Sequence, residues 1–439
     1  MKKQLLTTLL LLFITSFGFA QKIDTQKLDL YFKSLEENNK FMGSVAVSQN
    51  GKIVYTKAIG FADVENKIKA TEASKYRIGS ISKTFTTVLV LKAVEDKKLD
   101  LNQTIGKYFP TIMNADKISI RHLLTHRSGI HSFTNDDDYL TWNTKAMTEK
   151  DMVAIITKGG SDFEPDSQAE YSNSNFVLLT YILEKAYKKS YSDLLTQHIT
   201  KPLGLTNTYL GGKINTEKSE CKSYKYAGSW IAESETDISI PLGAGGVVST
   251  PSDLVKFSDA LFNGKLLKKE NLELMKTIKD NYGMGLFITP FNGRTGYGHT
   301  GGIDGFSSAF SHFSDGNVSF ALTSNGANYN TNNIAIAILS VAFNEPFDVP
   351  QFKTYQNTTA DLDKYLGIYS SDKIPLKITI SKDNITLIAQ ATGQSSFPLE
   401  ATDKDKFEFD QAGVVLEFNP AEKVMVLKQG GGEFTFKKE

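Results

Sequence analysis

The alternation of hydrophobic and polar residues predicts a β-hairpin near the start of the chain and a buried helix after it. Two β-rich runs, at residues 43–47 and 52–59, are joined by Asn50-Gly51, a dipeptide that is typical of tight hairpin turns. From Thr84 to Val94 the apolar residues fall at helical spacing. We therefore expect a hairpin that is followed by a helix packed in the core.

Strand patterns return late in the chain, after a long region of mixed character. Residues 100–280 combine short helical patterns with loops rich in Gly, Ser and Asn. Strand signals follow at 298–313 and 318–323, and an apolar helix follows at 334–343. An antiparallel sheet whose strands are distant in the chain, with helices between them, belongs to the α+β class. The sequence therefore predicts an α+β fold.

A second, smaller unit follows a change in composition near residue 345. Residues 346–360 carry two prolines and a polar Gln-Asn-Thr-Thr run, which is typical of a linker. Beyond the linker, short segments alternate with period two and are separated by turns. These segments are residues 376–380, 385–389, 414–418, 424–428 and 434–436. We expect a small β-barrel or sandwich at residues 361–439.

The first twenty residues have the features of a secretory signal peptide. A cationic start, Met1-Lys2-Lys3, precedes an apolar stretch at 5–13, and Gly18-Phe19-Ala20 places small residues where signal peptidase cleaves. An anchored helix is the alternative, but the apolar stretch is short for a membrane span. We expect cleavage after Ala20, a main domain at 21–345, and a secreted or periplasmic protein with no transmembrane anchor after cleavage.

Composition excludes several classes of function. The 439 residues include 49 basic and 49 acidic side chains, so there is no broad basic surface for nucleic acid. Cys221 is the only cysteine, which rules out an intramolecular disulfide, a thiolate zinc site and an iron–sulfur cluster. It is interpreted as an inert thiol. We expect no cofactor and no metal.

The clearest candidate for chemistry is Gly79-Ser80-Ile81-Ser82-Lys83, which leads directly into the predicted helix. On a helix, Ser80 and Lys83 face the same way and come within hydrogen-bonding reach. This pair suits a serine nucleophile whose proton is taken by a desolvated lysine with a lowered pKa. For an isolated Ser-x-x-Lys, a surface helix cap is the alternative.

Tyr171-Ser172-Asn173 is the second motif that supports this chemistry, and it stands between a polar loop and an apolar helix. Tyr171 can share a proton with Ser80 and Lys83. Asn173 can donate a hydrogen bond to a substrate carbonyl or orient the lysine. Alone, the motif would be read as a turn with a half-buried tyrosine.

His299-Thr300-Gly301-Gly302 is the third motif, and we place it on a predicted edge strand. The glycines allow a substrate backbone to approach closely. The N–H groups of Ser80 and Gly302 can together form an oxyanion hole.

In this order, Ser80-x-x-Lys83, Tyr171-x-Asn173 and His299-Thr300-Gly301 resemble the three motifs of the serine β-lactamase and penicillin-binding protein superfamily. The Tyr-x-Asn form resembles the class C β-lactamase and DD-peptidase/esterase branch. The resemblance covers residues 25–345 and implies an antiparallel sheet flanked by helices, plus a mainly helical subdomain. Tyr365-Leu-Gly-Ile-Tyr369 resembles the opening of lipocalin-like β-domains.

The resemblance implies a hydrolase that forms an acyl-enzyme on Ser80, with Lys83 and Tyr171 handling the proton. The residues expected to bind substrate are Asn173, His299, Thr300 and Gly301. His299 stands where β-lactamases of this branch usually carry lysine, which can hold a carboxylate near neutrality. The expected substrates are D-amino-acid-containing peptides, amides or small esters, with peptidoglycan fragments as further partners.

Two alternatives stay open: a class C-like β-lactamase that uses the same residues, and a non-catalytic penicillin- or peptidoglycan-binding protein. His122 and His126 are four apart but lack the glutamate of a His-Glu-x-x-His zinc site, so they are interpreted as structural. Gly243-Ala-Gly-Gly is interpreted as a tight turn near the site. Asp136-Asp137-Asp138 is interpreted as a solvated loop.

Overall fold

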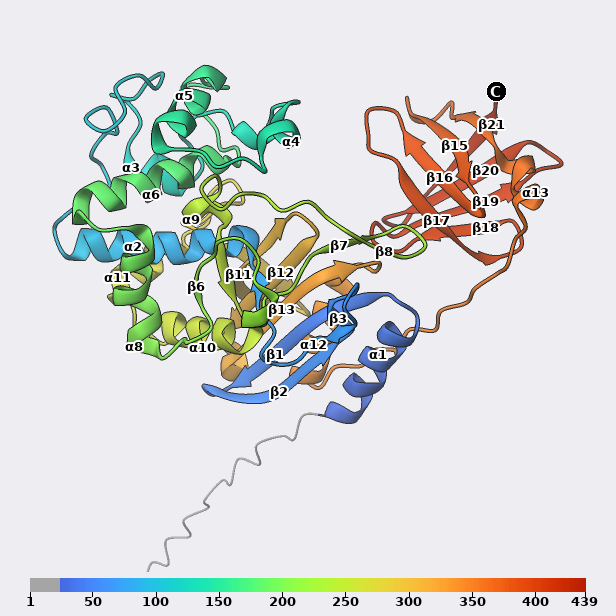
Figure 1. Ribbon diagram of the computed structural model, residues 1–439, viewed down its shortest axis with the longest axis horizontal. Coiled ribbons are helices and arrows are strands. Elements are labelled where there is room, and N and C mark those ends of the chain that lie inside the picture. Colours follow the sequence, from blue (N-terminus) through green and yellow to red (C-terminus); the bar gives the residue numbers. More distant parts are fainter. Residues whose placement is uncertain (1–23) are drawn as a thin grey trace, which may run out of the picture.

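The computed structural model describes residues 24–439, which form two units joined by an extended segment (Figure 1). The predicted signal peptide lies outside these residues. Among the residues described, no helix is both long enough and apolar enough to span a membrane. The larger unit contains a six-stranded sheet, and the smaller one is a closed barrel.

The six-stranded sheet is antiparallel and combines strands from the two ends of the larger unit. In sheet order the strands are β10 (Phe287–Phe291), β11 (Arg294–Ile303), β12 (Phe306–Phe313), β13 (Val318–Ala327), β1 (Phe41–Gln49) and β2 (Lys52–Ile59). β1 and β2 form the hairpin predicted around Asn50-Gly51. The sheet and its surrounding helices confirm the predicted α+β class.

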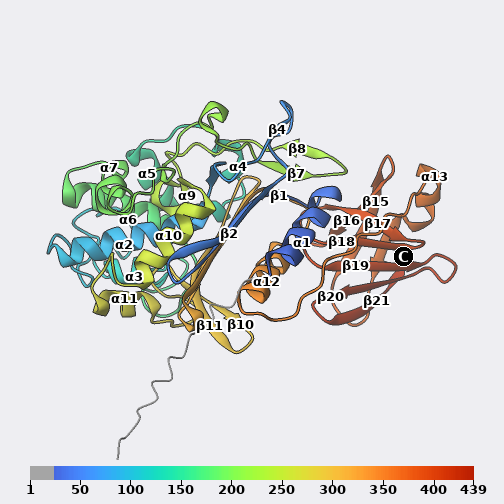
Figure 2. The same ribbon diagram turned by 90° about the horizontal axis from the view of Figure 1, so that it is seen from below.

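Helices cover both faces of this sheet (Figure 2). On one face lie α1 (Thr25–Glu37) and α12 (Thr331–Ala342), and on the other lies α10 (Pro251–Phe262), with α2 (Ser82–Glu95) and α6 (Asn173–Tyr187) beyond it. Side chains of β1 alternate between the two cores: Val45 and Val47 face α1 and α12, while Ala46 faces the α2 side. This period-two division fits a sheet that is buried on both faces.

The remaining elements of the larger unit are short. The helices are α3 (Ile120–Leu124), α4 (Tyr139–Trp142), α5 (Glu149–Gly159), α7 (Tyr191–Leu195), α8 (Lys201–Leu203), α9 (Leu242–Gly245) and α11 (Lys269–Lys276). The strands are β3 (Phe61–Asp63), β4 (Ile68–Lys69), β5 (Tyr76–Arg77), β6 (Tyr209–Leu210), β7 (Tyr224–Tyr226), β8 (Trp230–Ala232) and β9 (Val247–Ser249).

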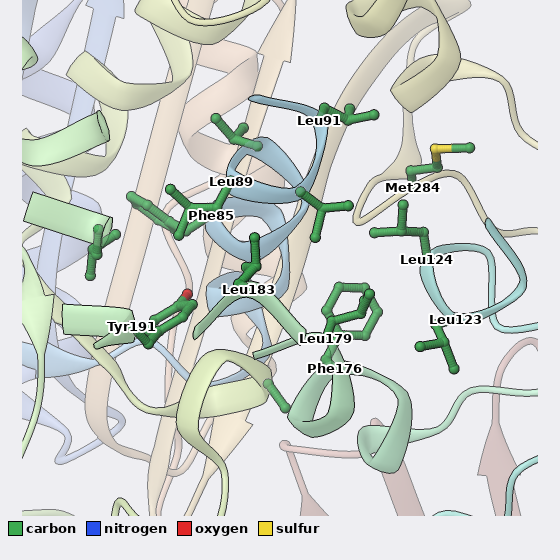
Figure 3. Close-up of a cluster of buried hydrophobic side chains, with 14 of the residues drawn as sticks. Phe85, Leu89, Leu91, Leu123, Leu124, Phe176, Leu179, Leu183, Tyr191 and Met284 are labelled. Atoms are coloured by element: carbon green, nitrogen blue, oxygen red, sulfur yellow. The ribbon is translucent and has the colours of Figure 1, made fainter. Parts of the chain in front are cut away.

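The core around α2 fixes the start of that helix. Figure 3 shows Phe85 and Leu89 of α2 beside Leu179 and Leu183 of α6. Phe85 also stacks on Phe257 of α10, with ring centroids 3.9 Å apart. Because α2 is buried on almost every side, its first turn cannot shift without disturbing the whole core.

The smaller unit is a closed, eight-stranded antiparallel barrel, so the predicted choice between barrel and sandwich resolves to a barrel. Its strands are β14 (Gly367–Ser370), β15 (Lys377–Asp383), β16 (Thr386–Ala391), β17 (Phe397–Asp403), β18 (Lys406–Phe409), β19 (Val414–Asn419), β20 (Val424–Gln429) and β21 (Gly432–Lys438). The short helix α13 (Thr359–Leu362) precedes them, and residues 343–358 hold no helix or strand. The exact domain boundaries stay a prediction.

Lys40 joins the barrel to the larger unit. Its ammonium lies 2.6 Å from Glu400 and 2.8 Å from Asp410, both of the barrel, and its side chain is only 5% exposed. Burial opposes the charged form, but hydrogen bonds with Asp410 and Glu400 raise the pKa of Lys40 above its ordinary value. Asn328, whose backbone N–H donates to the Lys40 carbonyl, also bonds Glu400. The junction is therefore a charged contact in which the lysine is buried while both carboxylates keep partial contact with water.

Candidate active site

Ser80 lies in a single 3₁₀ turn, Gly79–Ile81, that runs directly into α2. Strand β11 passes very close to this turn. A Cβ atom added to Gly79 would lie 2.7 Å from the Gly302 nitrogen, and one added to Gly301 would lie 2.1 Å from the Ile78 carbonyl oxygen. Gly79 also has a φ of +49°, a conformation that favours glycine. These glycines allow the Ser80 turn and β11 to meet backbone to backbone.

The Lys83 ammonium group is completely buried beside Ser80. Its Nζ atom lies 3.0 Å from Ser80 Oγ, 2.7 Å from Asn173 Oδ1 and 2.7 Å from the Ala244 carbonyl oxygen. None of these three partners is negatively charged. Burial therefore holds the pKa of Lys83 well below its ordinary value.

A neutral amine accounts for all three contacts of Lys83. Its two N–H groups can be donated to the oxygens of Asn173 and Ala244, which leaves the nitrogen lone pair directed at Ser80. In that state Lys83 can accept the proton of the Ser80 hydroxyl. This geometry is compatible with the pairing of a serine nucleophile and a general base that the sequence predicts.

The Tyr171 ring packs against the Lys83 side chain, beside Ser80. The centre of its ring is 4.9 Å from Lys83 Nζ. Burial raises the pKa of the Tyr171 phenol, and the neighbouring Ser80 hydroxyl offsets the rise only in part. The side chain is thus a neutral phenol that can give up or pass on a proton, and it is not a phenolate base.

Asn173, the first residue of α6, is held in one orientation by two neighbours. Its backbone N–H donates to Ser132 Oγ over 3.0 Å, and its Nδ2 donates to Thr134 Oγ1 over 2.9 Å. With the amide nitrogen engaged in this way, Oδ1 faces Lys83. Of the two roles expected for Asn173, this geometry matches orientation of the lysine.

His299 is buried, and it does not line the cleft. Its ring packs against Phe287 with centroids 4.4 Å apart, and its Nδ1 lies 2.5 Å from the Thr300 carbonyl oxygen. Burial, reinforced by the nearby Lys83, lowers the pKa of His299 to about 3. The imidazole is therefore neutral at physiological pH, and it does not titrate near neutrality as the residue type suggests.

The strand that carries His299 is not an edge strand, so this prediction is wrong. β10 pairs with β11 as far as Gly298 and leaves the outer edge of β11 without a strand partner only from His299 onward. Thr300 is exposed there, and Gly302 lines the cleft. The free edge starts where the motif starts.

The cleft beside Ser80 has a volume of about 480 Å³. Its lining includes Ser80, Asn173 and Gly302, together with Phe133 and Thr134. Pro241–Gly245 and the segment 233–236 contribute to the remaining lining. Among the residues that line this cleft there is no lysine or arginine. The predicted tight turn at Gly243 is α9, whose Ala244 carbonyl accepts the hydrogen bond from Lys83.

His126, which the sequence indicated as structural, packs directly behind the site against Tyr171. It lies beyond the end of α3 with a φ of +56°, so it does not share a helix face with His122. Its ring stacks on Tyr171 at 4.5 Å, and its Nδ1 accepts a hydrogen bond from the Ser172 N–H. No group of possible metal ligands occurs within residues 24–439. Ser132, Thr134 and Ala244 were also missed, because nothing in their local sequence points to Lys83.

Comparisons with known proteins agree with this geometry. The family model described as Beta-lactamase matches residues 31–342. The chain is 27% identical to penicillin-binding protein 4* of Bacillus subtilis over 92% of this chain and 97% of that protein. It is 28% identical to a teichoic acid D-alanine hydrolase of Staphylococcus aureus over 60% of this chain and 66% of that protein.

The fold is also similar to that of a solved structure. The D-amino acid amidase from Ochrobactrum anthropi SV3, complexed with L-phenylalanine amide, superposes with a TM-score of 0.64 at 27% identity, over 73% of this chain and 99% of that one. Fold and site together define a serine hydrolase with the β-lactamase fold. The chain belongs to the Beta-lactamase family.

Proposed function

We propose that the protein is an exported serine hydrolase that cleaves amide or ester bonds of D-amino-acid-containing substrates through an acyl-enzyme on Ser80. The observation that carries the proposal is the buried Lys83, which has no anionic partner and lies 3.0 Å from Ser80 Oγ. Burial lowers the pKa of such a lysine and so favours its free-base form, and a free base can activate a serine.

The first half of the reaction forms the acyl-enzyme. Lys83 takes the Ser80 proton as Oγ bonds to the substrate carbonyl carbon. The N–H groups of Ser80 and Gly302 donate to the resulting oxyanion. As the intermediate collapses, the bond to the leaving amine or alcohol breaks, and the proton held by Lys83 reaches that group through the Tyr171 phenol. Asn173 keeps Lys83 oriented throughout.

The second half releases the acid. Water attacks the ester carbonyl and loses its proton to Lys83, the same N–H groups bind the oxyanion, and the proton returns to Ser80 Oγ as the ester bond breaks. Under this proposal His299 acts by packing against Phe287 and not by direct contact with substrate. Thr300 and Gly301 would present the free edge of β11 to the substrate backbone.

The cleft itself supports substrates without a carboxylate at the reacting end. His299 is neutral, and no lysine or arginine lines the cleft, so nothing there compensates a buried carboxylate charge. β-Lactams and free peptide C-termini carry such a carboxylate. Among the similar proteins, the D-amino acid amidase and the teichoic acid D-alanine hydrolase are both named for D-amino acid substrates, which supports this substrate class.

Export rests on the signal peptide predicted at residues 1–20, and it places the enzyme where peptidoglycan fragments are available. Location is tested by recovering the protein outside the cytoplasm and measuring its mass. That mass should correspond to a chain that begins at Gln21. Recovery of the uncleaved chain in the cytoplasm would contradict export and leave the chemistry unaffected.

The function is tested with a panel of D-amino-acid amides, p-nitrophenyl esters and a chromogenic cephalosporin. We expect turnover of the amides and esters, slow or no turnover of the cephalosporin, and no turnover by Ser80→Ala. A phosphonate probe should add to the wild type and leave Ser80→Ala unlabelled. Full activity in Ser80→Ala would overturn the proposal. Rapid cephalosporin turnover would favour a β-lactamase. The absence of both turnover and labelling would favour a binding protein.

A further inference from the structure

The catalytic cleft continues into a second groove that reaches the barrel. This groove has a volume of about 370 Å³ and shares Glu233 and Asp304 with the cleft. Its lining also includes Gln411, a barrel residue between β18 and β19. A surface that begins at Ser80 thus ends on the other domain.

The charged side chains at the start of the groove are already compensated. Lys225 pairs with Glu233 at 3.2 Å, and Asp304 accepts hydrogen bonds from Arg77 and from Thr236 Oγ1. Because Lys225 is the only lysine or arginine along this groove, and it is paired, the groove is unsuited to a polyphosphate chain, which needs clustered cations.

The rest of the groove offers neutral hydrogen-bonding groups. Ser307, which faces Gly302 across the β11–β12 pair, has a buried hydroxyl with no partner among the described residues. Thr331 opens α12, and Gln411 donates to the Ala327 carbonyl. The accessible side chains of Thr331 and Gln411 can complement the amide groups of a peptide.

Along this groove, the aromatic surface that could stack on a sugar ring is limited to the partly exposed Tyr329. Of the aromatic residues along it, Tyr224 and Phe306 are 1% and 3% exposed. The Tyr329 ring is packed edge-on against Phe352. This lining therefore favours a peptide over a glycan.

We propose that this groove binds a peptide that continues from the D-amino-acid unit in the cleft, and that Gln411 of the barrel is part of the substrate-binding surface. The inference rests on the proposed function, because it extends the substrate of the same site. It assigns the barrel a direct role in selecting longer substrates.

The test compares kcat/KM for a single D-alanyl amide with amides extended by three residues on the acyl side or on the leaving-group side. We expect one extended series to be the better substrate, mainly through a lower KM. Gln411→Ala and Thr331→Ala should each reduce the ratio of long to short kcat/KM by roughly three- to tenfold, the value of one or two hydrogen bonds.

Thr386→Ala is the matched control, because Thr386 is a barrel residue that faces Gly228 and does not line this groove. It should leave the ratio unchanged. An unchanged ratio in Gln411→Ala and Thr331→Ala, or a larger gain from a disaccharide extension than from a peptide, would overturn the inference. Failure of the proposed function looks different, because then not even the short amide is cleaved.

Discussion

Lys83 in the active site and Lys40 at the barrel junction are both buried, but their surroundings differ in charge. Lys83 contacts a hydroxyl, an amide oxygen and a backbone carbonyl, and its pKa is lowered by burial. Lys40 contacts two carboxylates, which raise its pKa in spite of burial. The charge state of a buried lysine is therefore decided by its partners. One lysine is suited to proton transfer and the other to holding two domains together.

The largest effect is expected when Lys83 is removed. Lys83→Met eliminates the group that we propose accepts the Ser80 proton, and kcat/KM for a D-amino-acid amide should fall roughly 10²- to 10⁴-fold, the usual contribution of a positioned base. Steady-state kinetics measure the loss, and circular dichroism checks the fold. Lys40→Met is the matched control, since it removes a buried lysine elsewhere and should retain turnover of the single D-alanyl amide.

An intermediate effect is expected when the Lys83 site is made to resemble the Lys40 site. Asn173→Asp places a carboxylate against Lys83, which favours the ammonium form and should raise the pKa of Lys83. Activity requires the free base, so kcat/KM increases as pH rises through the pKa of Lys83. The acidic limb of the pH profile should therefore move to higher pH, so that the variant loses more activity at low pH than at high pH.

That pH profile separates electrostatics from geometry. If Asn173→Asp lowers the rate equally at every pH, the loss comes from misplacement of the lysine and the electrostatic account is wrong. Recovery of activity at high pH would support it.

The smallest effect is expected at the junction. Lys40→Met leaves Glu400 and Asp410 without their cation, but both carboxylates keep some contact with water, so the cost should be about 2 kcal/mol, below that of a fully buried broken pair. Proteolysis of residues 343–358 and thermal unfolding measure it. Adding Glu400→Gln and Asp410→Asn to Lys40→Met should restore much of the loss, and no restoration would argue that lost packing dominates.

The site residues and elements that could be predicted are those that depend on residues close together in the sequence. Ser80 and Lys83 are brought together by helical spacing. The β1–β2 hairpin was predicted from the alternation of hydrophobic and polar residues and from the Asn50-Gly51 turn. The alternating strands of the tail predicted a small β-domain. The strands missed there were short or interrupted: β18 spans only Lys406–Phe409, and β17 contains Pro398.

What could not be predicted depends on contacts between distant segments. β10 was missed because it is short and contains Pro290, although proline is tolerated in an edge strand. Since β10 forms the edge of the sheet, β11 is not the edge strand. The sequence shows a histidine at 299, but its low pKa follows from burial against Phe287 and the nearby Lys83. The hydroxyls that orient Asn173 come from Ser132 and Thr134, some forty positions earlier in the chain.

The pairing of β1 with β13 has a consequence for the order of folding. Phe41 pairs with Ala327, so the centre of the sheet closes only after nearly the whole larger unit has been synthesised. Ser80 and Lys83 are made early, but the strand that carries Gly301 and Gly302 is made late. Contacts this distant in sequence form slowly. A nascent or truncated chain that ends before β11 would hold the serine and its base without a wall to bind substrate, so activity should begin only when synthesis of the domain is complete.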